Sequence, residues 1–495
     1  MVRRVMVLAL VLFAGFCYSA PQTAQAATED EYFELMKVFV DSFEQIDRNF
    51  VEPVDRRELI EAAMRGMILK LDPHSTYINS NDLKQFNESV DQEFGGIGIQ
   101  VSVEPKTRNL MVMTPLPGTP AYKAGIRAGD HIIEIDGKAT ADFGFGHEME
   151  KAVEMMRGKP GETVSVKIQH IGAPNPETLE IVRAVIKTPT VLGDHYDSDG
   201  NWSFLMEGED KIGYIRLTNF ARNSVEEFHD ALEKLKKEGM KGLILDLRFN
   251  PGGLLSAATA ISDFFIDSGV IVSTKGRNTE EQVFKAHRAG TYSGFPMVIL
   301  VNRFSASASE IVSACLQDHK RAIIVGERTY GKGSVQNVIP LEGGKTALKL
   351  TTASYHRPSG KNIHRLPKAT EKDEWGVMPN EGFEVKLSDD DLEKLAISRR
   401  ERETLRSGEA PKNDFVDPQL GKGLAWLKDQ LTAKPDAEKP ANTGEKGKDK
   451  DNDKPEPKAE SKNEGAAILP PRTNLFVDAI LEFLRTQPGR PVRAA

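Results

Sequence analysis

The sequence predicts a multidomain chain of mixed α/β and α+β class, with a helical N-terminal region, a glycine-rich β-domain and an α/β core. Its 495 residues leave room for two or three domains. Apolar residues recur at helical spacing before residue 90, and short strands alternate with turns over residues 91–185. Strands alternate with helices over residues 186–390, the pattern of an α/β arrangement.

Residues 1–26 have the pattern of an export signal. Arg3 and Arg4 precede an apolar run, Val5 to Phe16, and Ala24-Gln25-Ala26 supplies the small residues of a cleavage site. An uncleaved anchor is the alternative, but the run is shorter than a membrane span of about 20 residues. We expect an exported, periplasmic chain without a stable membrane span, with membrane association left open. The net charge of −8 gives no reason to expect nucleic acid as a partner.

Residues 27–90 are predicted to be helical. The stretches “EYFELMKVFVDSFEQIDRNF” and “RRELIEAAMRGMILKL” carry apolar residues at helical spacing, and Asp72-Pro73 ends the second helix. We expect this region to pack against the chain or to form a homodimer contact, and we expect no chemistry in it.

Residues 91–185 contain a candidate peptide-binding loop, Gly95-Gly96-Ile97-Gly98. Backbone N–H groups among these glycines suit a terminal carboxylate, and the strand that follows can accept an extended peptide as an additional strand. A plain glycine-rich hairpin is the alternative. The order of the elements and the run “GTPAYKAGIRAGDHIIEIDG” resemble a bacterial-type PDZ domain, which favours the binding site.

Three serines follow the predicted strand “FPMVILVNR” in the stretch “FSASASEIVSACLQ”. Ser307 is predicted to lie near a helix N-terminus, where free N–H groups and the helix dipole stabilise negative charge. Ser305 suits a helix N-cap, and Ser309 can point into the helix. Capping and tight packing of small residues is the alternative for all three.

Lys332 follows a second predicted strand, in “GERTYGKGSVQ”. Burial between glycines and apolar strands lowers the pKa of a lysine, and a neutral lysine can act as general base for a serine. The same letters match the start of a phosphate-binding loop, G-x-x-x-x-G-K. That loop requires Ser or Thr next and then a helix, whereas Gly333 and a predicted strand follow here.

Taken together, the motifs resemble those of the carboxyl-terminal processing proteases, also called tail-specific proteases. They occur in order as “KIGYIRLTNF”, “DLRFNPGG”, “SASASEI”, “LQDHKRA”, “GERTYGKGSVQ”, “ALKLTTASYHRPSGKNI” and “GVMPN”. The resemblance covers roughly residues 30–430. It implies a crotonase-like α/β protease core, protein or peptide substrates with free C-termini, and no metal or organic cofactor.

The resemblance also implies residue roles. Ser307 is the expected nucleophile, Lys332 the base, and Gln336 the residue that orients the lysine. The expected oxyanion hole is the N–H of Ala308 with that of Gly253, Gly252 being the second choice. Asp318 matches a position that is sometimes sensitive in the family, and we expect it to support its helix. Asn380 stands where the family usually has Asp, which affects a turn rather than the chemistry.

The expected domain boundaries follow these patterns. They are 1–26 signal peptide, 27–90 helical region, 91–185 PDZ domain, 186–390 protease domain, 391–432 helical C-terminal extension, 433–470 disordered charged linker and 471–495 short helix. The basic run “LAISRRERETLR” is predicted to be a solvated helical face.

The sequence therefore predicts an exported serine endopeptidase that recognises substrate C-termini and cleaves through an acyl-enzyme. Two alternatives remain. One is an inactive PDZ scaffold, which an intact Ser307, Lys332 and Gln336 argue against. The other is a Ser-His-Asp hydrolase that uses one of three histidines, His319, His356 or His364.

Overall fold

The computed structural model describes residues 29–104, 107–197, 200–403 and 415–432. The predictions for residues 1–26, 433–470 and 471–495 lie outside these ranges. The chain divides into two compact units, and the boundary lies between Met67 and Ile68. Over the described ranges, no helix combines the length and the apolar character that a membrane crossing requires.

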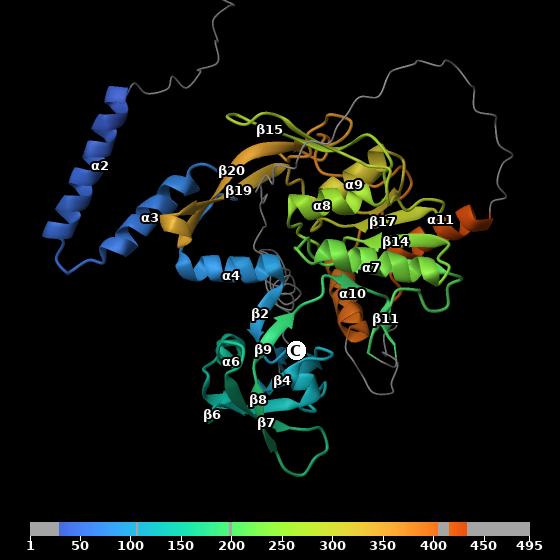
Figure 1. Cartoon of the computed structure of the whole chain (residues 1–495), viewed down its shortest axis with the longest axis horizontal. Helices are drawn as coiled ribbons and strands as arrows, with labels where there is room; N and C mark the ends of the chain where they lie inside the picture. The colour runs from blue at the N-terminus through green and yellow to red at the C-terminus, as the bar shows by residue number, and fades with distance from the viewer. Residues whose placement is uncertain (1–28, 105–106, 198–199, 404–414, 433–495) are drawn as a thin grey trace, which may run out of the picture. The chain divides into compact units, whose positions relative to one another are not determined.

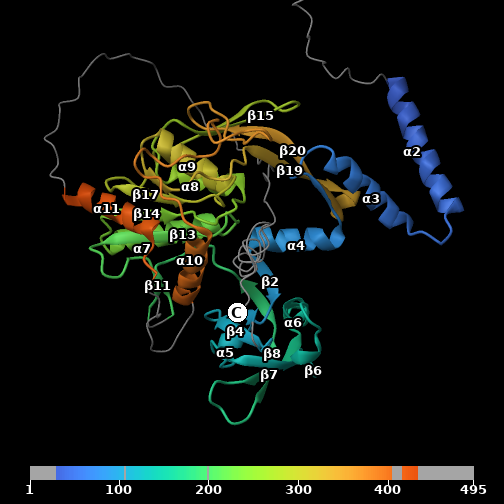
Figure 2. The same ribbon diagram turned by 180° about the vertical axis from the view of Figure 1, so that it is seen from behind.

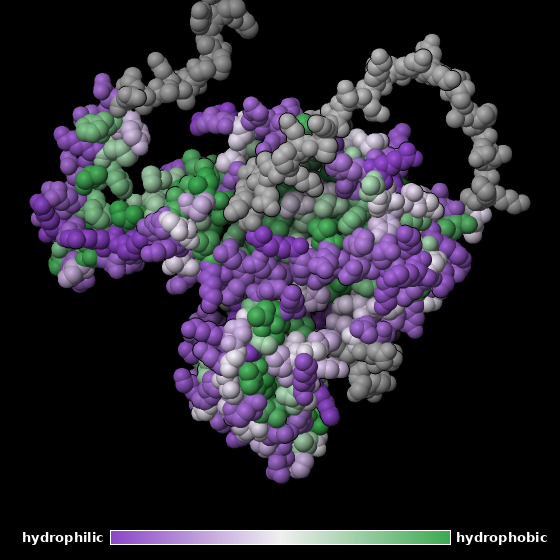
Figure 3. All heavy atoms as spheres, in the orientation of Figure 1, coloured by the Kyte–Doolittle hydropathy of each residue, from purple (hydrophilic) through white to green (hydrophobic). Residues whose placement is uncertain are grey.

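The N-terminal unit consists of α2 (Glu29–Asn49) and most of α3 (Arg56–Leu69). Arg56 joins the two helices by donating to both carboxylate oxygens of Asp47, at 2.9 and 2.8 Å. Large side chains of α2, such as Tyr32 and Phe33, are exposed. Figure 3 shows green patches among purple ones on this unit. The predicted helical character of this region is confirmed up to residue 69.

The glycine-rich β-domain has a five-strand path in the order β3-β4-β5-β7-β8, with β6 beside β5. Its strands are β3 (Ile99–Val103), β4 (Leu110–Pro115), β5 (His131–Ile135), β6 (Lys138–Ala139), β7 (Thr163–Gln169) and β8 (Glu177–Val182). Helix α5 (Pro120–Lys123) and helix α6 (Glu148–Met156) accompany them, and α6 packs against β3. Strand β3 is an edge strand, so one of its sides is unpaired within this sheet.

A two-stranded ribbon leads into and out of the β-domain. Strand β2 (Glu93–Gly96) pairs antiparallel with β9 (Ala184–Lys187), with Phe94 opposite Ile186 (Figure 1). Helix α4 (Ser80–Asp91) precedes this ribbon. The ribbon is separate from the β-domain sheet, so part of the predicted loop lies in a paired strand.

The core is a three-layer α/β/α structure (Figures 1 and 2). Its central sheet has the order β10-β13-β14-β17-β18, namely β10 (Val191–Leu192), β13 (Ile212–Leu217), β14 (Gly242–Asp246), β17 (Met297–Val301) and β18 (Ile323–Gly326). The last four strands are parallel. Helices α7 (Ser224–Lys237), α8 (Leu255–Asp263) and α9 (Ala308–Asp318) pack on one face, and α11 (Pro418–Thr432) packs on the other.

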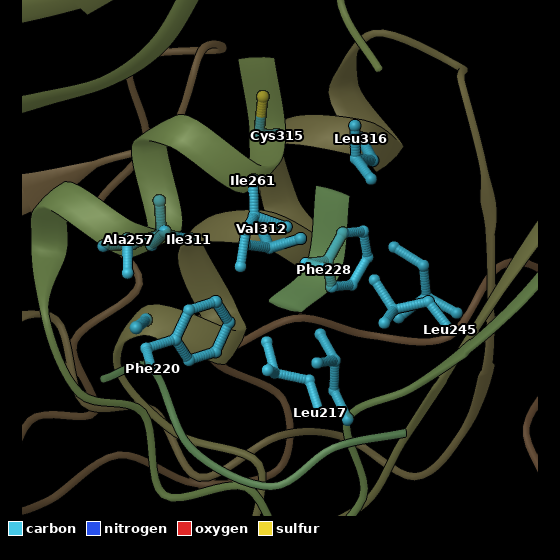
Figure 4. Close-up of a cluster of buried hydrophobic side chains, with 14 of the residues drawn as sticks. Leu217, Phe220, Phe228, Leu245, Ala257, Ile261, Ile311, Val312, Cys315 and Leu316 are labelled. Atoms are coloured by element: carbon cyan, nitrogen blue, oxygen red, sulfur yellow. The ribbon is translucent and has the colours of Figure 1, made fainter. Parts of the chain in front are cut away.

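Side chains alternate between the two faces along each strand, which explains why both faces of the central sheet are covered by apolar clusters. Leu243 and Leu245 contact the cluster under α7, α8 and α9, while Ile244 between them contacts the cluster under α11. Figure 4 shows side chains of the larger cluster, including Cys315 on α9, which is fully buried. Cys315 therefore packs in the core.

A second sheet of the core is antiparallel. It comprises β1 (Thr76–Ile78), β15 (Val270–Gly276), β16 (Gln282–Lys285), β19 (Ser334–Leu341) and the long β20 (Thr346–His356). Strand β1 corrects the prediction of a helical region through residue 90, because residues 76–78 pair with residues 347–349 of β20. Three residues are too few to show a strand pattern in the sequence.

The basic run near residue 400 corrects a second prediction. It lies on α10 (Asp389–Arg402), but Arg399 is largely buried and forms an ion pair with Asp246 at the end of β14. Arg402 forms an ion pair with Asp194. A buried carboxylate on the central sheet therefore binds this helix, and the run is not simply a solvated face. The remaining short strands are β11 (His195–Tyr196) and β12 (Trp202–Ser203).

Candidate active site

Ser307 lies at the N-cap position of α9, in the turn that follows β17. Its φ of 54° and ψ of −113° place a non-glycine residue in a strained part of backbone space. The side chain is buried, with 1% of the residue exposed. Strain of this kind persists only where surrounding contacts enforce it, and here a carboxylate does so.

The enforcing carboxylate belongs to Glu310, at the third position of α9. It accepts four hydrogen bonds. Oε2 accepts from the N–H of Ser307 and of Lys332, and Oε1 accepts from the N–H of Gly331 and from the Thr329 hydroxyl. The Thr329 oxygen itself accepts from the Val377 N–H, so its proton points to Glu310.

Four donors leave no acceptor for a proton on Glu310, so the arrangement fits the ionised form. Burial raises the pKa of this carboxyl, and the four hydrogen bonds oppose that shift. Glu310 is fully buried. Sequence reasoning missed this residue, although Ser307-x-x-Glu310 has the spacing of a capping box.

The neighbouring serines have their own partners. The Ser305 hydroxyl donates to the carbonyl of Leu247 over 2.8 Å, and that of Ser309 donates to the carbonyl of Asn250 over 2.9 Å. Both tie the turn to the end of β14. Ser307 is thus the member of the three whose hydroxyl is not used to hold these loops together.

Lys332 follows β18 and is also buried, with 1% of the residue exposed. Burial, helped by the nearby charge of Lys349, lowers the pKa of its amine to about 7, while Glu310 and Asp72 oppose the shift. A strand, β19, follows the lysine, so the helix that a phosphate-binding loop requires is absent at this point.

The backbones of Ser307 and Lys332 are held together by the Glu310 carboxylate, which accepts a hydrogen bond from each. No hydrogen bond joins the Ser307 hydroxyl to the Lys332 amine in the described structure; the Ser307 side chain lies near the hydroxyl of Tyr355, a buried residue of β20. Sequence reasoning did not identify Tyr355. Catalytic hydrogen bonds are often absent or long until substrate binds.

Gln336 lies fully buried on β19, opposite Thr351 of β20. Its Nε2 donates to the hydroxyls of Ser334 and Thr351, at 2.9 and 3.1 Å. Its Oε1 is buried and accepts no hydrogen bond from the described residues. An unused acceptor on a side chain that is otherwise fixed is available to a nearby donor.

The glycine turn after β14 lies against the turn that carries Ser307. A Cβ on Gly252 would stand 2.8 Å from the Ser307 Cβ and 2.9 Å from the Ala308 nitrogen. The Gly252 N–H donates to Asn250 Oδ1 over 2.8 Å. The N–H groups of Gly253 and Ala308 have no acceptor among the described residues, so both can bind an incoming oxygen.

No hydrogen bond joins any of the three histidines to Ser307 in the described residues. His319 lies at the C-cap of α9, twelve residues after Ser307, and is therefore about 18 Å along the axis from it. Its Nε2 contacts the carbonyl of Val270. His364 lies near Lys332, and burial lowers the pKa of its imidazole. The Nδ1 atoms of His356 and His364 are buried without a described partner.

Two further positions have structural contacts. Asp318 forms an ion pair with Arg357 at 2.7 Å and accepts from the Ser359 N–H, so it links α9 to the loop after β20. Asn380 accepts from the Ile324 N–H through Oδ1, at 2.8 Å. Both contacts lie away from Ser307. Within the described ranges, no group of His, Cys, Asp or Glu side chains is arranged to hold a metal ion.

The predicted peptide-binding loop is divided by the fold. Gly95 and Gly96 belong to β2, where a Cβ on Gly95 would stand 2.0 Å from the Gly158 carbonyl oxygen. Gly98, with φ of 80°, immediately precedes the edge strand β3. The carbonyls of Ile97 and Gly98 accept from the N–H groups of Ala121 and Leu116, which fixes the loop beside α5.

Three family models match the chain. Peptidase family S41 matches residues 211–379, the PDZ domain matches residues 111–170, and the activating protease CtpB N-terminal domain matches residues 17–82. The first match contains the turn of Ser307, the loop of Lys332 and Gln336. The second contains most of the β-domain sheet.

Two relatives cover most of this chain. A carboxy-terminal-processing protease of Bartonella bacilliformis is 36% identical over 422 residues, which are 83% of this chain and 92% of that protein. The carboxy-terminal processing protease CtpA of Bacillus subtilis is 34% identical over 420 residues, covering 84% and 82%. A solved photosystem II D1 C-terminal processing protease is 29% identical and covers 73% of this chain and 94% of its own, with a TM-score of 0.39.

Proposed function

The chain belongs to the carboxy-terminal processing proteases of peptidase family S41 and is a serine peptidase with a PDZ domain, and on that premise we propose that Ser307 and Lys332 form its catalytic dyad. The observation that supports this most directly is the shared carboxylate, Glu310 Oε2, to which both backbones donate at 2.8 Å. It holds a serine hydroxyl and a desolvated amine in one buried site.

In the proposed reaction, the Ser307 hydroxyl turns to Lys332, whose neutral amine takes its proton as the oxygen attacks the scissile carbonyl. The resulting ammonium then gives the proton to the leaving amine, and water hydrolyses the acyl-enzyme by the reverse steps. Gln336 orients the lysine, because its unpartnered Oε1 can accept from the Lys332 amine.

The oxyanion of the tetrahedral intermediate binds to the N–H groups of Ala308 and Gly253. The choice of Gly253 over Gly252 rests on availability, since the Gly252 N–H already donates to Asn250. Donors that are fixed before the reaction typically lower the barrier by about 3 to 4 kcal/mol each. The glycine at 253, with φ of 142°, also allows the close approach to Phe220 that holds this turn.

The deciding experiment compares Ser307→Ala with the wild type on a fluorescein-labelled unfolded protein such as casein. Ser307→Ala should remove activity, and a fluorophosphonate probe should label wild type at this residue only. Ser305→Ala and Ser309→Ala are the matched controls, because each loses buried structural hydrogen bonds yet leaves the reacting hydroxyl in place. Turnover by a folded Ser307→Ala chain would refute the assignment.

Recognition of substrate C-termini is proposed for the PDZ domain. The unpaired edge of β3 and the packing of α6 against it suit an added peptide strand, and Gly98 precedes that edge. A peptide with a free apolar C-terminus should bind the full-length Ser307→Ala chain more tightly than its C-terminal amide. Equal affinities would contradict carboxylate recognition while leaving the dyad untouched.

Export is proposed from the charged and apolar pattern of residues 3–26. It is tested by fractionating the producing bacterium and sequencing the N-terminus of the mature chain. A mature N-terminus near Ala27 is expected, and a chain found only in the cytoplasm with Met1 intact would contradict it.

A further inference from the structure

The loop of residues 72–75, which follows α3, is hydrogen-bonded to β20. Strand β20 pairs with β19, the strand that follows Lys332. The Ser75 hydroxyl donates to Asp72 Oδ2 over 2.8 Å, and the Thr351 N–H donates to the Ser75 oxygen over 3.0 Å. Thr351 in turn accepts from Gln336 Nε2. Asp72 is therefore tied through two hydroxyl groups to the residue proposed to orient the lysine.

A second buried lysine lies on the same strand. Lys349 is two residues before Thr351 on β20, so both side chains lie on one face of the sheet. Lys349 pairs in register with Val338 of β19 on one side and Thr76 of β1 on the other. Only 6% of it is exposed. A lysine in this position is taken out of water by two neighbouring strands.

Lys349 and Asp72 both act electrostatically on Lys332, with opposite signs. We propose that Lys349 and Asp72 are positioning residues that set the protonation state of Lys332, Lys349 favouring the neutral amine and Asp72 favouring the ammonium form. This inference rests on the proposed role of Lys332 as base. A neighbouring positive charge is an established way to make a lysine amine reactive near neutral pH.

The other ionisable groups around Lys332 do not provide a second positive charge that favours the neutral amine. Burial lowers the pKa of His74 and of His364, which disfavours a positive charge on either imidazole. Glu310 holds the backbone N–H of Lys332 and acts in the same direction as Asp72. Lys349 is thus the positive charge set against two carboxylates, and burial lowers its own pKa to about 8.

The test uses two variants of the full chain whose effects should be opposite. Lys349→Met removes the like charge, so the acid limb of the pH–rate profile should move up by about one pH unit. Asp72→Asn removes the opposite charge, so the limb should move down. Both the rate of fluorophosphonate labelling of Ser307 and the cleavage of labelled casein are measured from pH 5 to pH 10. Loss of packing alone would lower the rates at every pH without moving the limb.

Two further variants control the comparison. Lys349→Arg keeps the charge and should keep the limb in place, whereas it would abolish activity if Lys349 were itself the base. Lys345→Met removes an exposed lysine between β19 and β20 and should change nothing. Thermal unfolding checks that each variant is folded. If Lys349→Met does not fold, the test rests on the other two variants: the acid limb should move down in Asp72→Asn and stay in place in Lys349→Arg.

The failures are distinguishable. A wild-type chain without Ser307-dependent labelling would overturn the proposed dyad and this inference together. An active wild type whose acid limb stays in place in Lys349→Met and Asp72→Asn, or moves in the same direction in both, would overturn this inference alone. Opposite shifts would establish it.

Discussion

The backbone N–H groups of Ser307 and Lys332 donate to the same oxygen, Oε2 of Glu310, each over 2.8 Å. One buried carboxylate therefore fixes the turn that carries the hydroxyl relative to the loop that carries the amine. The other oxygen holds Gly331 and Thr329 in the same loop. The site is positioned by backbone contacts before any substrate arrives, which is how fixed geometry lowers a reaction barrier.

Glu310→Gln should inactivate the enzyme, although the side chain keeps its shape. An amide NH₂ group would face either the N–H groups of Ser307 and Lys332 or that of Gly331, leaving at least one buried donor unsatisfied at a cost of about 1–3 kcal/mol. We expect kcat/KM to fall at least about 100-fold, because misplacement by about 1 Å has that effect. Glu280→Gln, on an exposed loop, is the control, and near-wild-type activity in folded Glu310→Gln would contradict the role.

The pH dependence of activity should report the state of Lys332. Because burial lowers the pKa of this amine to about 7, the neutral base forms as pH rises through that value, and the rate should rise with it. Lys332→Arg should be as inactive as Lys332→Ala, since arginine stays protonated. The measurement is a pH–rate profile from pH 5 to pH 10 with circular dichroism at each pH. Substantial activity in a folded arginine variant would exclude the dyad.

Gly252→Ala should remove activity through a steric contact at the nucleophile. The added Cβ would stand 2.8 Å from both the Ala306 carbonyl oxygen and the Ser307 Cβ, at a residue with φ of 104°. Gly290→Ala is the matched control, because Gly290 has φ of 84° but open space around its Cβ position. Both should lose about 1–3 kcal/mol of stability from backbone strain, yet only Gly252→Ala should lose about two orders of magnitude in kcat/KM, comparable to the loss of one oxyanion donor. Equal activities would show that the turn is not part of the site.

Asp246→Asn should destabilise the core at neutral pH. Arg248 and Arg399 surround this fully buried carboxyl and hold its pKa far below the usual range. The substitution removes the negative charge that faces the guanidinium groups of Arg248 and Arg399. Breaking a buried ion pair in this way typically lowers the free energy of unfolding by about 3–5 kcal/mol. The measurement is thermal unfolding of wild type and variant over a range of pH.

The pH dependence of that difference follows from the direction of the shift. A carboxyl with a depressed pKa stabilises the fold fully above its unfolded pKa, about 3.9, and this contribution is lost as pH falls toward the folded value. The gap between wild type and Asp246→Asn should therefore be constant above about pH 5 and narrow below pH 4. Asp267→Asn, at an exposed position, is the control and should show no such gap.

Much of the site follows from local patterns in the sequence. A strand followed by small residues and a helix places Ser307 at a helix N-terminus, and a strand followed by glycines places Lys332 in a loop; both elements are confirmed. The mixed α/β class and the family are confirmed as well. Glu310 was within reach of the same reasoning, because its spacing from Ser307 is that of a capping box.

Contacts between remote segments were decided only by the tertiary structure. Asp72 lies in a region for which the sequence predicts no chemistry, and the pairing of residues 76–78 with β20 brings it within electrostatic range of Lys332. The sequence predicts that Arg399 is one of several solvated arginines in a basic run. In the structure, it forms an ion pair with Asp246 of β14. In both cases a charge is repositioned by burial against a partner far away in the chain. Local periodicity reports which face of an element is apolar, but it carries no information on which distant charge that face will meet.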